Sequence, residues 1–251
     1  MGEILINTEG LIKTFGKFVA IDELNLTFES GIITSIIGPN GAGKTTAINL
    51  LTGALYPDQG KVFFRGEDIT FLQPDQRVRR GIARSFQVMD IFPMLTVLEN
   101  VQLPLLARFR KTRKWFFPVP YYGDILDEAE IILNYLGLWN KKDVTAGELS
   151  HGDQRLLEMG MAIASKPEIC FLDEPSSGMN PLERAKVLEL IRSLAEEGST
   201  TFVIVEHDLD VIFSLSDRII VMNKGSVLAE GEPDEIRKNK EVIEIYLGEE
   251  I

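Results

Sequence analysis

Hydrophobic residues recur along the chain in two patterns, and the order of these patterns predicts the fold. Short runs of β-branched and other apolar residues, bounded by turn residues, predict strands in the first third of the chain and again after residue 165. The predicted strands are Ile4–Thr8, Leu24–Phe28, Ile32–Ile37, Lys61–Phe64, Ile169–Leu172, Thr200–Val205 and Arg218–Met222. The run Ile32–Ile37 carries apolar residues on both faces, which is typical of a strand buried between helices in a parallel sheet.

Apolar residues at helical spacing predict the other elements. From about residue 88 to residue 164 the spacing is helical, and the sequence shows no run comparable to the strands above. The predicted helices are Thr45–Leu55, Asp124–Leu136, Asp153–Ala164 and Leu182–Ala195. This order predicts one doubly wound α/β domain over residues 1–251, with a β-rich start. We expect 1–87 and 165–251 to form the core with its β subdomain, and 88–164 to form an inserted helical subdomain.

Composition and charge narrow the class of protein. Of the 251 residues 45% are hydrophobic and 25% charged, as in a large globular domain. The net charge of −12 argues against nucleic acid as a partner, because binding to a phosphate backbone needs clustered Lys and Arg. Cys170 is the only cysteine, so we expect no intrachain disulfide. We find no signal peptide, and the longest uncharged stretch, Ser30–Gly43, is shorter than the about 20 residues of a membrane span. We expect the chain not to cross a membrane by itself.

A glycine-rich motif joins one predicted strand to the helix that follows it. The motif consists of Gly38, Pro39, Asn40, Gly41, Ala42, Gly43, Lys44, Thr45 and Thr46, and it matches the P-loop pattern G-x-x-x-x-G-K-[ST]. Glycines let consecutive N–H groups wrap a phosphate, and the start of the helix adds positive potential. We expect Lys44 to reach the β- and γ-phosphates and the Thr45 hydroxyl to bind Mg²⁺. The fold class that follows is α/β: a P-loop nucleotide-binding core with an N-terminal antiparallel β subdomain and an inserted helical subdomain.

Two adjacent acids end the predicted strand that begins at Ile169. We expect Asp173 to hold Mg²⁺, directly or through water, and Glu174 to orient or deprotonate the water that attacks the γ-phosphate. The alternative is a solvated pair of acids at the end of a strand. The sequence Asn223-Lys224-Gly225-Ser226 lacks the acid with which GTPases read guanine, so it predicts a turn. At this point the nucleotide is either ATP or GTP.

Further motifs resemble those of the ABC ATPases. Leu149-Ser150-His151-Gly152-Asp153-Gln154 is similar to their signature, Leu-Ser-Gly-Gly-Gln. Gln87 stands where the family has its Q-loop, Ser176–Pro181 follows Glu174 like the D-loop, and His207 stands where the family has its switch histidine. The resemblance covers the whole chain, with the motifs in the family's order and spacing.

This resemblance implies a composite site between two subunits. ATP with Mg²⁺ would lie between the Lys44 loop of one subunit and Ser150 and Gly152 of a second ATPase subunit. Glu174 would polarise water and His207 would contact the γ-phosphate. Gln87 would sense Mg²⁺ and water, and it is also a candidate metal ligand. Phe15 would stack on adenine, with Phe18 as a substitute.

The chain departs from the family pattern at three positions, and some motif residues have simpler explanations. His151 replaces a signature glycine, Asp153 replaces the signature glutamine, and Asn180 replaces the D-loop aspartate that many relatives carry. Ser150 and Asp153 also have the spacing of a helix capping box, which is compatible with an anion site at the same helix start. The alternative for Phe15 is a packing role, and His207 alone would be interpreted as a surface histidine.

The pattern also resembles one subfamily, the ATPases of branched-chain amino acid importers. This similarity is carried by Arg84 to Phe92, Thr96 to Asn100, the extra residues around 105–122 and Val205 to Asp208. Urea and lipopolysaccharide transporters share it in part. The implied partners are transmembrane permease subunits and, indirectly, an extracytoplasmic substrate-binding protein, with the chain peripheral at the cytoplasmic face of the cell membrane. The alternatives are ABC ATPases of translation or DNA repair and a pure binding module. The first usually fuse two such domains or insert a coiled coil, and Glu174 argues against the second.

The segment Arg108–Phe117 contains five cations, and three aromatic residues follow them at 115–117. We expect it to seat the ATPase against its partner or the bilayer surface, where each basic residue contributes about 1 kcal/mol on an anionic leaflet. The alternative is a solvated loop. Changing Arg108, Arg110, Lys111, Arg113 and Lys114 to Gln should leave ATP binding intact and weaken co-sedimentation with partner-containing membranes, most at low salt. Unchanged co-sedimentation across a salt series would favour the loop.

Overall fold

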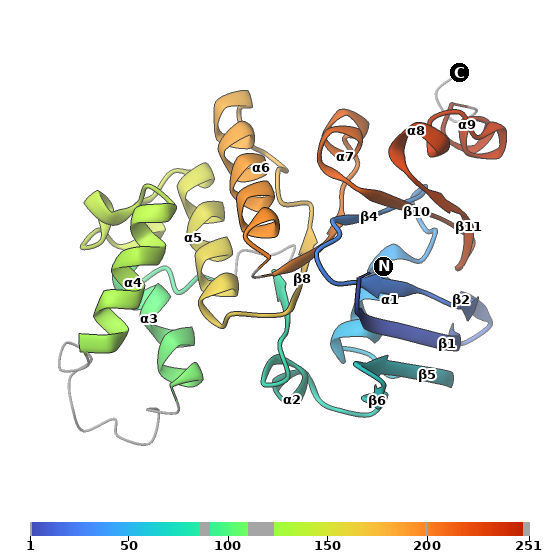
Figure 1. Cartoon of the computed structure of the whole chain (residues 1–251), viewed down its shortest axis with the longest axis horizontal. Coiled ribbons are helices and arrows are strands. Elements are labelled where there is room, and N and C mark those ends of the chain that lie inside the picture. The colour runs from blue at the N-terminus through green and yellow to red at the C-terminus, as the bar shows by residue number, and fades with distance from the viewer. Residues whose placement is uncertain (1, 86–90, 110–122, 199, 248–251) are drawn as a thin grey trace.

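The chain forms two β-sheets and a group of helices that extends to one side of them (Figure 1). The structure is a computed structural model that describes residues 2–85, 91–109, 123–198 and 200–247. Strand pairing is antiparallel throughout the N-terminal sheet and mostly parallel in the second sheet. The α/β class with an antiparallel β subdomain is therefore confirmed.

The N-terminal sheet has the order β2-β1-β5-β6, and β3 pairs with β1. Its strands are β1 (Ile4–Phe15), β2 (Phe18–Leu24), β3 (Thr27–Glu29), β5 (Gln59–Phe64) and β6 (Glu67–Asp68). The predicted strand Leu24–Phe28 is wrong, because β2 ends at Leu24 and the chain turns before β3. Glu23 adopts a left-handed conformation with φ of 46°, and the Asn25 side chain donates to its carbonyl, which stabilises this turn.

The second sheet has the order β11-β10-β4-β9-β8-β7, parallel except for β11. Its strands are β4 (Thr34–Ile37), β7 (Ile82–Ser85), β8 (Ile169–Asp173), β9 (Thr201–Val205), β10 (Arg218–Asn223) and β11 (Ser226–Gly231). Every residue of β4, β8 and β9 is buried. Side chains alternate between two cores: Phe171 packs toward α1 and the antiparallel sheet, whereas Cys170 and Leu172 pack toward the helices on the other face. This double coverage explains the apolar runs in the sequence.

Helices cover both faces of this sheet and form the group at one side (Figure 1). Those of the core are α1 (Lys44–Thr52), α2 (Pro74–Val78), α6 (Pro181–Glu196), α7 (Leu209–Leu215), α8 (Pro233–Ile236) and α9 (Lys240–Leu247). The group at one side comprises α3 (Val97–Arg108), α4 (Gly123–Tyr135) and α5 (His151–Ala164). The 3₁₀ turns η2 (Trp139–Lys141) and η3 (Ala146–Glu148) lie between α4 and α5. Within the described residues 91–109 and 123–164, the only β-pairing is one isolated bridge between Thr96 and Thr145. We propose residues 88–164 as the helical subdomain.

Arg108 at the end of α3 is tied into the helical group. Its guanidinium donates to both carboxylate oxygens of Glu128 on α4, at 3.1 and 2.7 Å, and to the carbonyl oxygen of Ala164 at 2.8 Å. Arg108 therefore joins three helices, which argues against a role at a membrane surface and removes it from the neutralisation series proposed above. Residues 110–117 of that basic segment lie outside the described residues.

Arg77 holds the end of α1 in place. Its side chain is fully buried and donates to four backbone carbonyls, those of Leu50 and Leu51 at 2.7 Å, Thr70 at 2.8 Å and Leu72 at 3.2 Å. The last carbonyls of a helix have no partner within the helix, so Arg77 supplies donors that α1 lacks. Burial lowers the pKa of Arg77 to about 10, which leaves it charged at neutral pH.

The substitution Arg77→Met should destabilise the chain by about 2–4 kcal/mol, because it leaves several buried carbonyls without a donor. The measurement is the urea midpoint of unfolding. Arg79→Met is the matched control, since Arg79 lies on the same short helix region with a side chain that is 79% exposed, and it should change stability by less than about 0.5 kcal/mol. Equal shifts for the two variants would contradict this role of Arg77.

Candidate nucleotide site

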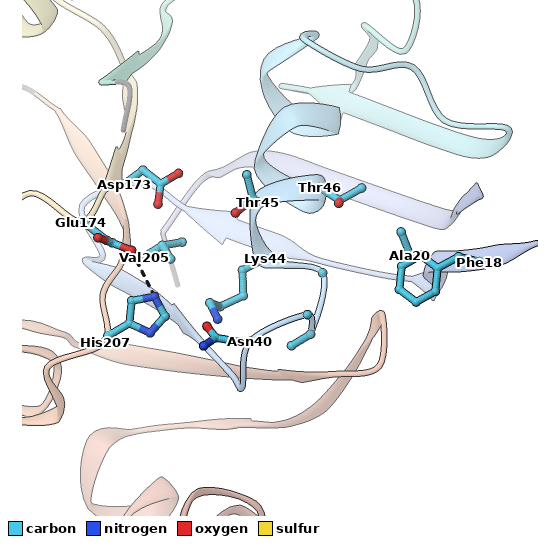
Figure 2. Close-up of a pocket in the computed structure, with 13 residues that line it drawn as sticks. Phe18, Ala20, Asn40, Lys44, Thr45, Thr46, Asp173, Glu174, Val205 and His207 are labelled. Atoms are coloured by element: carbon cyan, nitrogen blue, oxygen red, sulfur yellow. Dashed lines mark ion pairs between the residues drawn. The ribbon is translucent and has the colours of Figure 1, made fainter. Parts of the chain in front are cut away.

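A cavity of about 300 Å³ lies at the carboxyl ends of β4, β8 and β9, in front of the first turn of α1 (Figure 2). Its lining comprises Phe18, Ala20, Asn40, Gly41, Ala42, Gly43, Lys44, Thr45, Thr46, Asp173, Glu174, Val205 and His207. Figure 2 shows the acids and His207 at one end, Phe18 at the other and the glycine-rich loop between them. In open α/β sheets, ligands bind at the carboxyl ends of the strands. The cavity is therefore elongated, with an acidic end and an aromatic end.

The glycine-rich loop fits its surroundings only without side chains at two positions. A Cβ at Gly38 would lie 2.2 Å from the carbonyl oxygen of Met222, and one at Gly43 would lie 2.7 Å from that of Ala20. Gly43 precedes α1 with φ of 101° and has no side chain to cap the helix. The N–H groups of the first turn of α1 have no carbonyl partner within the helix, so they are available to an anion in the cavity.

Lys44 is buried and directs its ammonium along the same loop. Its Nζ donates to the carbonyl oxygens of Gly38 at 2.6 Å and Pro39 at 3.2 Å. Burial lowers the pKa of Lys44, while the charges of Asp173 and Glu174 raise it. A buried cation held by carbonyl dipoles beside free N–H groups is suited to a polyphosphate. Gly38 and Pro39 thus support Lys44 with their carbonyls rather than line the cavity.

The negative charge of the buried Asp173 carboxylate is only partly compensated by hydrogen bonds and nearby positive charge. It is 1% exposed, and its Oδ2 lies 3.4 Å from a guanidinium nitrogen of Arg84 on β7. Within the described part of the chain its Oδ1 is buried without a hydrogen-bond partner. Burial raises the pKa of Asp173, and the charge of Arg84 opposes this shift. An orphaned buried carboxylate oxygen across the loop from the Thr45 hydroxyl fits Mg²⁺, which proteins often hold through one or two carboxylates together with substrate phosphates.

Glu174 and His207 meet at the acidic end of the cavity (Figure 2). The Nε2 of His207 is 3.1 Å from the Oε1 of Glu174. Glu174 has a left-handed backbone with φ of 49°, and its N–H donates to the carbonyl oxygen of Val205 at 2.8 Å. This bond fixes the turn after β8 against the end of β9, so that the carboxylate points into the cavity. Non-glycine residues with such a backbone are uncommon and often occur at functional sites.

Ser150 and Gly152 lie at the start of α5 and do not line this cavity. Ser150 accepts a hydrogen bond from the N–H of Asp153 at 3.2 Å, as the capping-box prediction requires. The side chain of Asp153 does not return to the backbone N–H of Ser150, because it accepts from the Ser150 hydroxyl and from Lys141. The same chain therefore does not bring its signature residues to its own P-loop, so any joint action requires a second chain.

The two phenylalanines of the first hairpin differ in position. Phe15 and Phe18 pair across β1 and β2, yet Phe18 lines the cavity and Phe15 does not. Phe15 is 49% exposed, and the Nζ of Lys13 lies 5.8 Å from the centre of its ring. The geometry thus favours Phe18, which the sequence offered only as a substitute for Phe15.

Three further sequence predictions concern Gln87, the turn at residues 223–226 and Asn180. Gln87 lies outside the described residues. Residues 223–226 form the turn between β10 and β11, as predicted, and the N–H of Gly225 donates to the carbonyl oxygen of Ala42 at 2.9 Å. Asn180 caps α6 by accepting from the N–H groups of Leu182 and Glu183, so amide and acid serve equally as this cap. Sequence reasoning missed Arg84 as the partner of Asp173, because nothing in the linear sequence pairs a strand cation with a distant acid.

Comparison with known proteins gives consistent results. The sequence matches the family model of ABC transporters over residues 21–177, more than half of the chain. A second model, the branched-chain amino acid ATP-binding cassette transporter, matches residues 226–251. The high-affinity branched-chain amino acid transport ATP-binding protein LivG of Escherichia coli (strain K12) is 38% identical over 257 residues, covering 99% of this chain and 100% of LivG.

Solved structures agree with the sequence comparisons. MJ1267, an ATP-binding cassette of an ABC transporter solved in its ADP conformation, has a TM-score of 0.85 and 34% identity, covering 98% of this chain and 99% of MJ1267. MJ0796, a bacterial ABC transporter cassette with a dimeric structure, has a TM-score of 0.80 and 28% identity over 91% of this chain and 99% of its own. The chain therefore belongs to the ABC transporter family of ATP-binding cassettes, in the group that includes the branched-chain amino acid transport protein LivG.

Proposed function

We propose that this chain is the ATP-hydrolysing subunit of an ABC importer of branched-chain amino acids. The proposal rests on one observation: the glycine-rich loop, Asp173, Glu174 and His207 all line the same cavity. N–H groups and a lysine bind a polyphosphate, and an adjacent carboxylate activates water, so the cavity holds the groups that ATP hydrolysis requires. Family membership supports ATP as the nucleotide.

The loop residues bind and orient the nucleotide. The N–H groups at the start of α1 and the Lys44 ammonium face the β- and γ-phosphates, where charge accumulates during transfer. Phe18 stacks on the adenine at the other end of the cavity, since a flat ring is sufficient for this contact. Phe15 is the alternative. The remaining loop residues, Asn40 to Gly43 and Thr46, line the path between these ends.

Glu174 acts on the attacking water. Its carboxylate accepts a proton from the water as the water oxygen bonds to the γ-phosphorus and the bond to the bridging oxygen breaks. His207 lies within hydrogen-bond distance of Glu174, so it orients this carboxylate and contacts the γ-phosphate. Gln87 completes the set as a contact to Mg²⁺ and water.

Asp173 and the Thr45 hydroxyl would hold Mg²⁺ in the cavity, with Gln87 as a further ligand. When bound, the ion offsets the negative charge of the phosphates. The Arg84 guanidinium lies behind Asp173 and orients its carboxylate toward the loop.

A second ATPase subunit, identical or related, completes the site with Ser150 and Gly152. The dimeric structure of MJ0796 supports this arrangement. No described helix is long and apolar enough to span a membrane. We assign the transport path to separate transmembrane permease subunits, because the chain belongs to the ABC transporter family and LivG is the ATP-binding protein of a transport system. An extracytoplasmic binding protein delivers the substrate, and the chain is peripheral at the cytoplasmic face of the membrane.

The substrate assignment rests on two comparisons. Residues 226–251 match the branched-chain amino acid cassette model, and LivG is similar over its full length. Both favour branched-chain amino acids over the urea and lipopolysaccharide alternatives and over a role outside transport.

Lys44→Ala should abolish nucleotide binding, because it removes the cation that faces the β- and γ-phosphates. Mg-ATP at 100 times Kd should raise the wild-type Tm by roughly 5–10 °C and leave that of the variant unchanged. Lys61→Ala, at an exposed lysine of β5, is the control and should keep the wild-type shift. An equal shift for Lys44→Ala and wild type would rule out this binding mode.

Glu174→Gln keeps the shape of the side chain and removes its basicity, so phosphate release should fall by roughly 10² or more. ATP should then persist and hold two chains together. Light scattering with Mg-ATP should show a dimer for this variant and mostly monomer for the wild type loaded with ADP. Glu189→Gln, at an exposed acid of α6, should hydrolyse ATP like the wild type. A monomer in both nucleotide states would count against the two-subunit site.

A further inference from the structure

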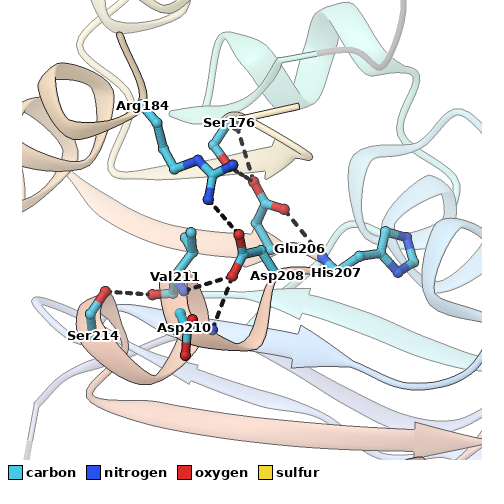
Figure 3. Close-up of polar contacts among 8 residues, drawn as sticks. All are labelled: Ser176, Arg184, Glu206, His207, Asp208, Asp210, Val211 and Ser214. Carbon is cyan, nitrogen blue, oxygen red and sulfur yellow. Dashed lines mark hydrogen bonds and ion pairs between the residues drawn. The ribbon is translucent and has the colours of Figure 1, made fainter. Parts of the chain in front are cut away.

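The histidine at the cavity is held through its two sequence neighbours. Glu206, His207 and Asp208 connect β9 to α7. Figure 3 shows that both neighbouring carboxylates bond to groups from the segment that follows β8, whereas the imidazole points away from them. This side chain is 52% exposed and faces Glu174.

Glu206 bridges the loops that follow β8 and β9. It is 4% exposed, and its Oε1 accepts from the backbone N–H and the hydroxyl of Ser176, at 3.0 and 2.5 Å. Its Oε2 accepts from the backbone N–H of His207 at 3.1 Å. One buried carboxylate thus links Ser176, two residues after Glu174, to the backbone of His207.

Asp208 fixes the other side of the histidine. Its Oδ1 accepts from the N–H groups of Asp210 and Val211 in the first turn of α7, at 3.0 and 3.4 Å. Its Oδ2 accepts from a guanidinium nitrogen of Arg184 on α6. The backbone of His207 is therefore tied on both sides, which fixes the point from which its side chain reaches Glu174.

Only a carboxylate meets the demands of position 206. The three donors reach it from two loops, and an ionised carboxylate has two accepting oxygens, whereas an amide has one accepting oxygen and one donating nitrogen. Burial of a charge is unfavourable unless it is compensated by hydrogen bonds. An acid at 4% exposure beside the reacting groups therefore points to a requirement for this bridge rather than to solvation.

We propose that Glu206 is a positioning residue that sets the place of His207 relative to Glu174 and links it to the Ser176 segment. This inference rests on the proposed function for the roles of His207 and Glu174. Ser176 begins Ser176–Pro181, the segment that resembles the D-loop, so one side chain joins that segment to the backbone of His207.

The first test is steady-state hydrolysis by the Glu206→Gln chain. The amide can serve Ser176 or His207 but not both, so kcat should fall by about tenfold while KM for Mg-ATP stays within about twofold, as expected for a misplaced group that acts in the reaction step. Asp210→Asn is the matched control, because it makes the same acid-to-amide change at an exposed position three residues after His207. It should leave both constants unchanged.

The second test reads the position of His207 without nucleotide. The chain has two histidines, so the Cε1–H NMR signals of His151 and His207 are assigned by substitution of either one. In Glu206→Gln the His207 signal should shift or broaden while that of His151 stays in place, and Ser176→Ala should cause a smaller change because its N–H remains. Should Glu206→Gln not fold, Ser176→Ala alone carries this test.

A wild-type His207 signal in the folded variants would overturn the bridge, whatever the activity. Loss of the bridge by NMR with unchanged kcat would overturn the positioning role. If His207→Ala itself hydrolyses ATP like the wild type, the proposed role of the histidine fails separately, and the NMR result still decides whether Glu206 holds it.

Discussion

Close contact between the glycine-rich loop and three neighbouring segments is the constraint on which this site depends. Gly38 lies against the end of β10, Gly43 lies against β2, and the carbonyl of Ala42 accepts from the turn at Gly225. Both sheets therefore fix the loop, so its N–H groups and Lys44 are oriented before a ligand arrives. Such preorganisation reduces the entropic cost of binding a polyphosphate. Arg77 extends the same support to the far end of α1, which keeps the helix start in register with the loop.

The parallel sheet converts this support into chemistry by bringing three strand ends together. β4 leads into the loop, β8 ends in Asp173 before Glu174, and β9 precedes Glu206 and His207. Burial disfavours the charged forms of both Lys44 and Asp173, and each is only partly compensated by its protein neighbours. In the proposed function, a bound magnesium nucleotide would supply the opposite charges that both lack. The buried charges of Lys44 and Asp173 thus lie where a bound ligand would stabilise them most.

Much of the fold and of the site could be predicted from local motifs, whereas contacts between residues distant in the sequence could not. The loop residues and the acids after β8 occur at fixed spacing in the sequence, and the buried strands β4, β8, β9 and β10 have apolar runs that identify them. The strand over Leu24–Phe28 was wrong because the chain leaves β2 after Leu24, next to the left-handed Glu23, and β3 begins only at Thr27. Arg77 lies in a polar stretch of the sequence, and Glu206 opens the polar run that follows β9. Both side chains are nevertheless buried by segments that the sequence does not place beside them. Phe18 was favoured over Phe15 only once the hairpin geometry was known.

The crystal structure of the Glu174→Gln chain with Mg-ATP decides whether two chains share each nucleotide. It should contain two chains around two nucleotides, with phosphates along residues 38–46 and Mg²⁺ at Thr45 and Asp173. Ser150 and Gly152 of the opposite chain should contact the γ-phosphate, and Phe18 should lie against the adenine. ATP bound away from Lys44, or held by one chain while Ser150 of every chain faces solvent, would contradict the account.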